Sequence, residues 1–204
     1  MNLIEGNITY KPTFDFQFGS GSHQTLLRNW ARGPMPWATV RGGAIELMQK
    51  HTSYNLVGNV LGSTFQVANT AFPTKYPLKV SPASPFNGYP NSYASLAIGY
   101  FSDNSGGDTY DASADWANTI AAGNYDYIAG AQIWYHPSNS ETIPDSYFYP
   151  SKPAYFGILP WPPIDPGTPT VGETVLPAGY RYRFGTNPPP AGLLPPTGIH
   201  VIGQ

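Results

Sequence analysis

The chain has 204 residues, a net charge of −2 and only 11% charged residues, with 22 glycines, 23 prolines and 15% aromatic residues. This length suits one domain with a substantial core. The low charge and the many aromatic residues are not typical of disordered chains, and the absence of a basic run argues against a nucleic-acid partner.

The sequence contains no cysteine, which excludes disulfides, thiolate nucleophiles and cysteine-based zinc sites. No apolar stretch approaches the ~20 residues of a membrane span, so we expect none. The N-terminal sequence MNLIEGN lacks the basic start and apolar core of a signal peptide. It begins inside a repeat, which predicts a chain cut from a longer protein.

A short apolar pattern ending in asparagine recurs along the chain. It reads NLIEGN, TLLRN, YNLVGN and TIAAGN and ends at Asn7, Asn29, Asn59 and Asn124, with steps of 22, 30 and 65 residues. We predict that each copy is a short strand whose asparagine occupies a left-handed or bridge conformation at a bend. We also expect the asparagine side chains to stack and to hydrogen-bond along a column.

Further strand-like runs lie between these copies. Residues 13–18 alternate apolar and polar side chains, and residues 44–48 and 95–101 occupy the same place in later repeats. A short run also follows each asparagine. Three strands per repeat predict an all-β fold, a right-handed parallel β-helix of about four to five coils.

Composition divides the chain into three parts. Residues 1–136 are predicted to form the coils, with an insertion at about 62–94. Fifteen of the 23 prolines lie between Pro137 and Pro196, and proline is excluded from central strands because it lacks a ladder donor. We therefore expect residues 137–166 to form a capping segment and residues 167–204 to form an irregular tail.

Three stretches resemble a known family: the chained pattern NLIEGN, SHQTLLRN and SYNLVGNVLG; GNYDY at 123–127; and IPDSYFYPSKPAYFGILPWPPIDP at 143–166. They are similar to the C-terminal part of bacterial secreted right-handed parallel β-helix proteins of pectate-lyase-like architecture. The resemblance implies that fold and an extracellular or cell-surface location, and it supplies no catalytic motif. Family members are longer, so it also implies an open sheet edge here, closed by self-association or by missing N-terminal coils.

One face of the predicted solenoid carries candidate catalytic residues. Asp15 and Gln17 are expected to point outward, with Glu46 one coil later, flanked by Arg41 and His51. Paired carboxylates can serve as the acid and base of a glycosidase, and Arg41 is the candidate base of a polysaccharide lyase. The same residue types also suit the solvated side of a half-buried strand.

Aromatic side chains on that face and its loops are candidates for sugar binding, because a flat ring offers an apolar surface at little entropic cost. The predicted ligand-binding set is Trp37, Tyr76, Tyr89, Tyr93, Gln17 and His51. His51 also precedes a repeat, which equally predicts a role in a turn. Trp134 and Trp161 are expected to pack in the core or the cap.

The acidic loop SDNSGGDTYD is a candidate calcium site. Its hard oxygen ligands would come from Asp103, Asn104, Asp108 and Asp111 on a glycine-bent turn. The spacing is not that of an EF-hand, and an acidic surface loop with Asx-turns explains the same residues.

Low charge and many aromatic residues favour a secreted carbohydrate-binding module for a plant or microbial polysaccharide. The sequence leaves two alternatives open. One is a polysaccharide lyase or glycoside hydrolase using Asp15, Glu46 and Arg41; the other is a structural or adhesion segment of a longer surface protein.

Overall fold

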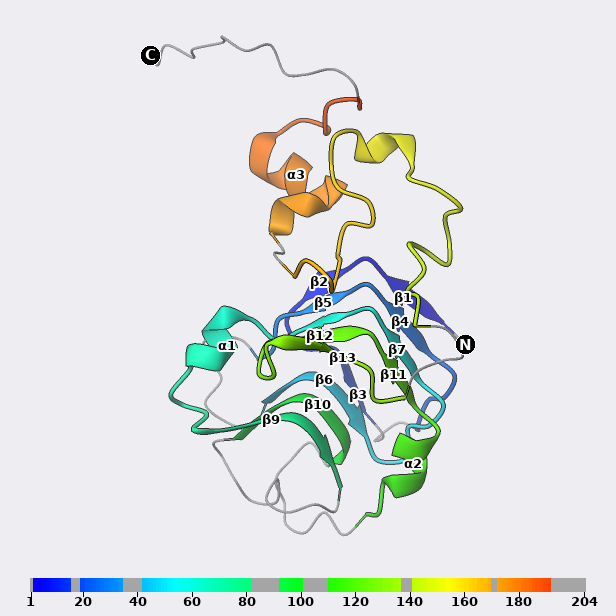
Figure 1. The fold of residues 1–204 in the computed structure, drawn as a ribbon, viewed down its shortest axis with the longest axis vertical. Coiled ribbons are helices and arrows are strands. Elements are labelled where there is room, and N and C mark those ends of the chain that lie inside the picture. The colour runs from blue at the N-terminus through cyan, green and yellow to red at the C-terminus, as the bar shows by residue number, and fades with distance from the viewer. Residues whose placement is uncertain are drawn as a thin grey trace.

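A computed structural model describes residues 2–15, 19–34, 42–81, 92–100, 110–136, 141–169 and 172–191. The chain forms three stacks of parallel strands that meet around a common core, with a C-terminal portion beyond one end of the stacks (Figure 1).

Each repeat contributes one strand to each of the first two stacks. The first stack, in spatial order, is β1 (Leu3–Glu5), β4 (Thr25–Leu27), β7 (Asn55–Val57) and β11 (Ile120–Ala122). The second is β2 (Ile8–Thr9), β5 (Trp30–Ala31), β8 (Val60–Leu61) and β12 (Asn124–Asp126), to which β13 (Ala131–Ile133) is added antiparallel. The four asparagine-terminated patterns are therefore strands, as predicted.

The third stack has the order β3 (Thr13–Phe14), β6 (Gly42–Met48), β10 (Ser92–Tyr100) and β9 (Thr74–Val80). The strand prediction for residues 44–48 is thereby confirmed, and so is that for 95–101 as far as the structure describes it, to Tyr100. Of the predicted strand at 13–18, β3 includes only Thr13–Phe14, and residues 16–18 lie outside the described residues. The core lies between the three stacks, where Leu26, Leu56, Ile45, Leu47 and Leu96 are almost completely buried. Burial of these apolar side chains is the main favourable term in folding.

The asparagines form the predicted hydrogen-bonded column. The backbone N–H of Asn7 donates to Asn29 Oδ1 at 3.0 Å, and the same bond links Asn29 to Asn59 and Asn59 to Asn124, each at 2.9 Å. Each side-chain amide donates to the same oxygen of the next asparagine. Because every buried oxygen accepts two N–H groups, the column satisfies polar groups at a corner that water does not reach.

The left-handed conformation predicted for the asparagines is wrong by one residue, and the bridge alternative stays a prediction. Positive φ angles occur at the residue before each asparagine, namely Gly6 (67°), Arg28 (50°), Gly58 (61°) and Gly123 (63°). Glycine adopts this conformation without a Cβ penalty. The asparagine is therefore selected by its side-chain amide, and the preceding residue makes the bend.

The predicted fold class, an all-β right-handed parallel β-helix of four to five coils, is wrong. The three stacks do not close into a solenoid, and helical segments interrupt and follow them. These segments are α1 (Thr64–Ala68), α2 (Ser113–Ala117), η1 (Ala154–Phe156), η2 (Glu173–Val175) and α3 (Pro177–Phe184).

Strand order explains why the winding stops. After β8 the chain runs through α1 to β9, which takes the outer position beside β10, where a strand from the next repeat would have to lie. After β12 the chain reverses into antiparallel β13. The expected insertion thus contains an edge strand, and the expected irregular tail contains α3.

Asp126 holds the reversal between β12 and β13. Its Oδ1 accepts hydrogen bonds from Ile128 N at 2.7 Å, Ser95 Oγ at 2.9 Å and Ala129 N at 3.1 Å. The residue is 2% exposed, and burial raises the pKa of its carboxyl to about 6, although the three hydrogen bonds oppose the shift. Ionisation of this carboxyl therefore costs stability.

Asn59→Val tests the column. The substitution leaves Asn29 N–H and Leu26 C=O without their partners in a buried corner, so we expect a loss of about 3–5 kcal/mol in the free energy of unfolding. Asn7→Ala, at the exposed end of the column, is the matched control and should cost about 1 kcal/mol. Equal losses in urea denaturation would contradict the view that burial of the column sets its contribution to stability.

Asp126 predicts a pH dependence of stability. Because its folded pKa lies above the ordinary value, its contribution is complete below about pH 4 and declines until about pH 6. Wild type should lose at most about 3 kcal/mol across this window from this one group. Asp126→Asn keeps an oxygen acceptor and should lack this component, as measured by urea denaturation at pH 4 to 7. An unchanged pH profile in the variant would contradict the assignment.

Candidate functional site

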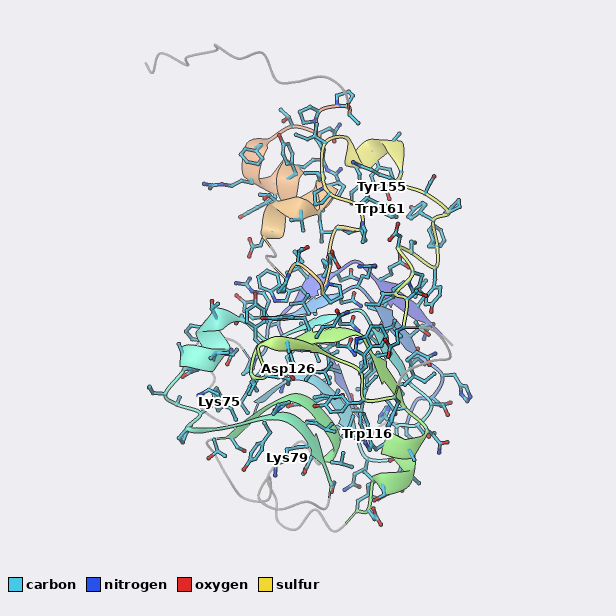
Figure 2. The ribbon with its side chains drawn as sticks, in the orientation of Figure 1. Lys75, Lys79, Trp116, Asp126, Tyr155 and Trp161 are labelled. Atoms are coloured by element: carbon cyan, nitrogen blue, oxygen red, sulfur yellow. The ribbon has the colours of Figure 1, made fainter. Side chains whose placement is uncertain are left out.

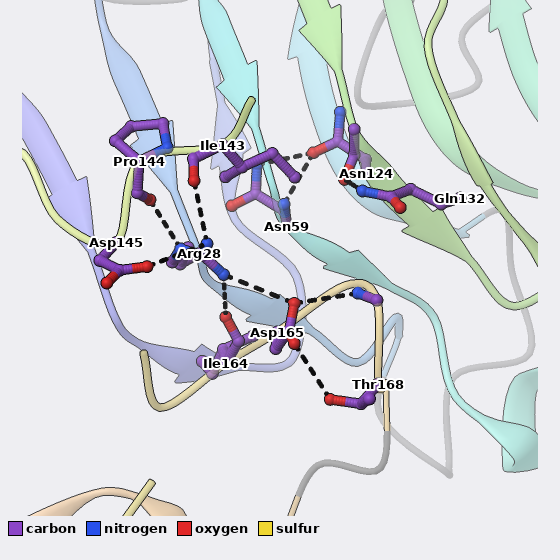
Figure 3. A network of polar contacts seen from close by, with 12 residues as sticks. Arg28, Asn59, Asn124, Gln132, Ile143, Pro144, Asp145, Ile164, Asp165 and Thr168 are labelled. Atoms are coloured by element: carbon purple, nitrogen blue, oxygen red, sulfur yellow. Dashed lines mark hydrogen bonds and ion pairs between the residues drawn. The ribbon is translucent and has the colours of Figure 1, made fainter. Parts of the chain in front are cut away.

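Arg28 joins the first stack to the C-terminal portion (Figure 3). Its guanidinium donates to the carbonyls of Pro144 at 2.8 Å, Ile164 at 3.0 Å and Ile143 at 3.2 Å. Three backbone carbonyls from two separate segments therefore converge on one side chain. Arginine suits this position because its planar head presents five donors in fixed directions.

Two carboxylates accompany this buried cation. Asp145 Oδ1 and Asp165 Oδ1 each lie 3.7 Å from a terminal nitrogen of Arg28, and the Arg28 side chain is 7% exposed. Burial lowers the pKa of Arg28, while Asp165 and Asp145 oppose that shift. The arginine remains charged, and its position binds residues 143–145 and 164–165 to the strands.

The corner beside Arg28 requires glycine. A Cβ atom on Gly58 would lie 2.5 Å from Ile143, and one on Gly123 would lie 2.6 Å from it. Residue 143 therefore packs directly on the backbone of two repeats. Farther along, the carboxylate of Glu5 accepts hydrogen bonds from the Ser146 hydroxyl and from Tyr147 N. Residues 143–147 thus run across the corners of successive repeats toward β1.

A cleft of about 340 Å³ lies between β1 and the C-terminal portion. Its aromatic wall consists of Tyr149, Tyr155, Phe156 and Trp161, and Figure 2 shows Tyr155 and Trp161 close together above the strands. The ring centroids of Phe156 and Trp161 are 5.0 Å apart in an edge-to-face arrangement, and Tyr149 lies 6.3 Å from Trp161. The rings support one another in a preferred geometry.

Tyr155 is the exposed member of this wall, with 51% of its surface accessible. Its hydroxyl donates to the hydroxyl of Tyr149 at 3.0 Å. This hydrogen bond and partial burial raise the pKa of Tyr155 to about 12, so its hydroxyl stays protonated at neutral pH. The cleft therefore offers tyrosine hydroxyl groups beside apolar rings.

Charged residues surround the same cleft. Glu5, Arg28 and Asp145 line it, but each already has a protein partner. Arg181, on α3, also lines the cleft, and no ion pair joins it to another residue within the described part of the chain. Arg181 is thus the cation that remains available to a ligand.

Two of the candidate catalytic residues, Asp15 and Glu46, do not line this cleft. Glu46 stands opposite Thr13 in the strand register, so Asp15 is not its direct neighbour. The Glu46 side chain is 7% exposed, and its Oε2 lies 3.1 Å from Lys11 Nζ. The third predicted residue, Arg41, lies outside the described residues, as does Gln17.

The predicted ligand-binding aromatics do not form one surface among the described residues. Tyr93 is fully buried, and Tyr76 is half-buried with Lys79 Nζ 3.8 Å from its ring centre. Trp37 and Tyr89 lie outside the described residues. His51 is 3% exposed and contacts the hydroxyl of Tyr54 and the carbonyl of Asp15, both at 2.9 Å. Its buried ring therefore joins residues of different repeats.

The calcium prediction stays a prediction. Asp103, Asn104 and Asp108 lie outside the described residues, and Asp111 Oδ1 accepts hydrogen bonds from the backbone and the hydroxyl of Ser113 at the start of α2. Elsewhere in the described ranges, no group of three or more acidic or histidine side chains could hold a metal ion. The described helices are also all too short or too polar to cross a membrane.

The sequence predicts that Trp161 packs in the core or the cap, so it does not predict the cleft. The available signal was the density of aromatic residues in YFYPSKPAYFGILPW at 147–161. Comparisons with known protein families, curated proteins and solved structures find no match to this chain. The resemblance to secreted parallel β-helix proteins therefore remains a prediction.

Arg28→Gly tests the anchor. Glycine adopts the same positive φ, as Gly6, Gly58 and Gly123 do, but removes every side-chain bond to residues 143–145 and 164–165. We expect the amides of Tyr147 and Ile158 to lose about 3 kcal/mol of protection in hydrogen exchange. The amide of Val60 in β8 should change little. A uniform loss of protection would contradict an anchoring role confined to the C-terminal portion.

Proposed function

We propose that the chain is a carbohydrate-binding module that recognises a plant or microbial polysaccharide in the cleft between β1 and the C-terminal portion. The observation that carries this proposal is the aromatic wall with half-exposed Tyr155. A sugar ring has one apolar face, which packs on an aromatic ring, and a rim of hydroxyl groups, which need polar partners. Tyr149, Tyr155 and Arg181 supply such partners beside the rings.

Preorganisation supports the same proposal. Arg28 and Glu5 join the two sides of the cleft through several hydrogen bonds, so a ligand would meet walls that are already in place. Binding to a preformed site avoids the entropic cost of ordering loops. This cleft replaces the groove that sequence reasoning predicted along Trp37, Tyr76, Tyr89 and Tyr93. The expected extracellular or cell-surface location belongs to this proposal, because polysaccharides of this kind lie outside the cell.

The experiment is affinity electrophoresis of the purified chain through gels that contain single neutral or acidic polysaccharides. We expect retardation by at least one of them. Tyr155→Ala should weaken binding about tenfold, because the accessible ring is the main packing surface. Tyr182→Ala is the matched control, because this α3 tyrosine is 93% exposed and does not line the cleft.

Four outcomes separate the alternatives. Retardation that is lost in Tyr155→Ala and kept in Tyr182→Ala supports the cleft. Retardation that neither substitution changes would place the binding site elsewhere, and no retardation by any polysaccharide would overturn the proposal. New reducing ends, or the ultraviolet absorbance of an unsaturated product, would instead establish a hydrolase or a lyase.

A further inference from the structure

The edges of the described sheets differ in how they are protected. The edge strand β9 carries Lys75, Pro77 and Lys79, and charged residues and proline are the usual means of preventing strand addition. The edge of β12 is covered by antiparallel β13. Strands β1 and β2, with the sequences LIE and IT, have neither lysine nor proline. Their one charged side chain, Glu5, is already bonded to Ser146 and Tyr147, and no strand of the described residues pairs with their outer edge.

Hydrogen-bonding groups of this edge point away from the protein. Asn7 and Thr9 direct their carbonyls to Trp30 N and Arg32 N of the second stack. Because successive residues of a strand direct their polar groups to opposite sides, the N–H and C=O of Ile8 face outward. In β1, the carbonyl of Asn2 and the N–H of Gly6 bond to the next repeat, so the polar groups of Leu3 face outward in the same way.

The asparagine column also ends at this edge with an incomplete pattern. The side-chain oxygens of Asn29, Asn59 and Asn124 each accept two N–H groups from the preceding asparagine. Asn7 Oδ1 receives no hydrogen bond from the described residues. The amides of Asn29 and Asn59 also donate to Ile4 O and Leu26 O of the previous repeat, whereas the amide of Asn7 donates to Glu5 O of its own strand.

Open space follows the edge. Cavities of about 390 Å³ and 580 Å³ adjoin the cleft, and both share Asn7 with it. Together the three cavities follow the chain from Leu3 to Tyr10. Leu3, 41% exposed, lies at one end as an apolar contact for an incoming side chain.

We infer that this edge binds an extended polypeptide segment, which adds one parallel strand to β1 and one to β2 and places an asparagine over Asn7. The backbone N–H and the side-chain amide of that asparagine would donate to Asn7 Oδ1, repeating the bonds that Asn7 makes to Asn29. Outward groups of Leu3 and Ile8 would supply main-chain bonds, as in other cases of strand addition.

The same geometry defines the sequence of the segment. Its asparagine must follow a residue that tolerates positive φ, because Gly6, Arg28, Gly58 and Gly123 all have this conformation at the equivalent position. An apolar residue two positions before glycine corresponds to Ile4 and Leu56, whose side chains contribute to the core or pack against it. The expected pattern is therefore apolar, any residue, glycine, asparagine.

This inference does not depend on the proposed carbohydrate binding. Gly6 and Asn7 line both the cleft and the edge, so a bound segment and a saccharide are expected to compete. The two proposals can still fail separately, because one is tested with peptides and the other with polysaccharides.

The probe is a fluorescent synthetic peptide with the sequence YNLVGNVLG, which is residues 54–62 of this chain. We expect saturable binding to the 204-residue chain in fluorescence anisotropy. Two matched peptides serve as controls: one replaces the second asparagine with alanine, and the other carries an N-methyl group on the backbone nitrogen of that asparagine. Each control removes a donor to Asn7 Oδ1 and should bind about tenfold more weakly.

Asn7→Ala in the protein provides the complementary test. This variant should weaken binding of the unmodified peptide by more than tenfold, because it removes the acceptor of both bonds. It should weaken binding of the alanine peptide by only about tenfold, because that peptide retains the backbone N–H as its one donor to Asn7 Oδ1. Absence of saturable binding, or equal binding of all three peptides, would overturn the inference. If the chain binds polysaccharide but no peptide, the cleft binds saccharides and the edge of β1 and β2 does not bind a strand.

Discussion

The asparagine column is the interaction on which the rest of the molecule depends. It holds four repeats in one register through paired bonds from Asn7 to Asn124, and it satisfies buried polar groups where the first two stacks meet. A fixed register places the preceding residues, among them Gly58 and Gly123, above one another. These glycines form the surface on which Ile143 packs. The column therefore determines where the C-terminal portion can begin to contact the strands.

Arg28 links the column to the cleft. It occupies a position where the other repeats have glycine, and its positive φ angle is unfavourable for a residue with a Cβ atom. Its side chain, however, donates hydrogen bonds to the carbonyls of Ile143, Pro144 and Ile164. A glycine at this position would relieve the backbone and leave those carbonyls without a donor. The single departure from the repeat is thus the residue that positions the aromatic wall of the cleft.

Local patterns were informative about strands and about the column. These patterns are the repeated asparagine, the alternation that begins at Thr13, and the apolar runs at 44–48 and 95–101. Each depends on residues that are close together in the sequence, so it can be recognised without knowledge of the fold. Strand order is different, because it depends on which segments of the whole chain pair with each other. β9 takes the place beside β10, and no local pattern in TKYPLKV states this. The prediction of a continuous solenoid was wrong for that reason.

The sequence by itself determined the short strands, the asparagine column and the end of the strand repeats near residue 137, where the chain becomes rich in proline. Each of these follows from residue type and spacing. Only the tertiary structure decided which residues meet at the cleft. Glu5, Arg28, Tyr155 and Arg181 are far apart in the chain and come together because the C-terminal portion folds back across the first repeats. Burial was decided in the same way. Glutamate and tyrosine are often exposed residue types, yet packing of the third stack leaves Glu46 and Tyr93 buried.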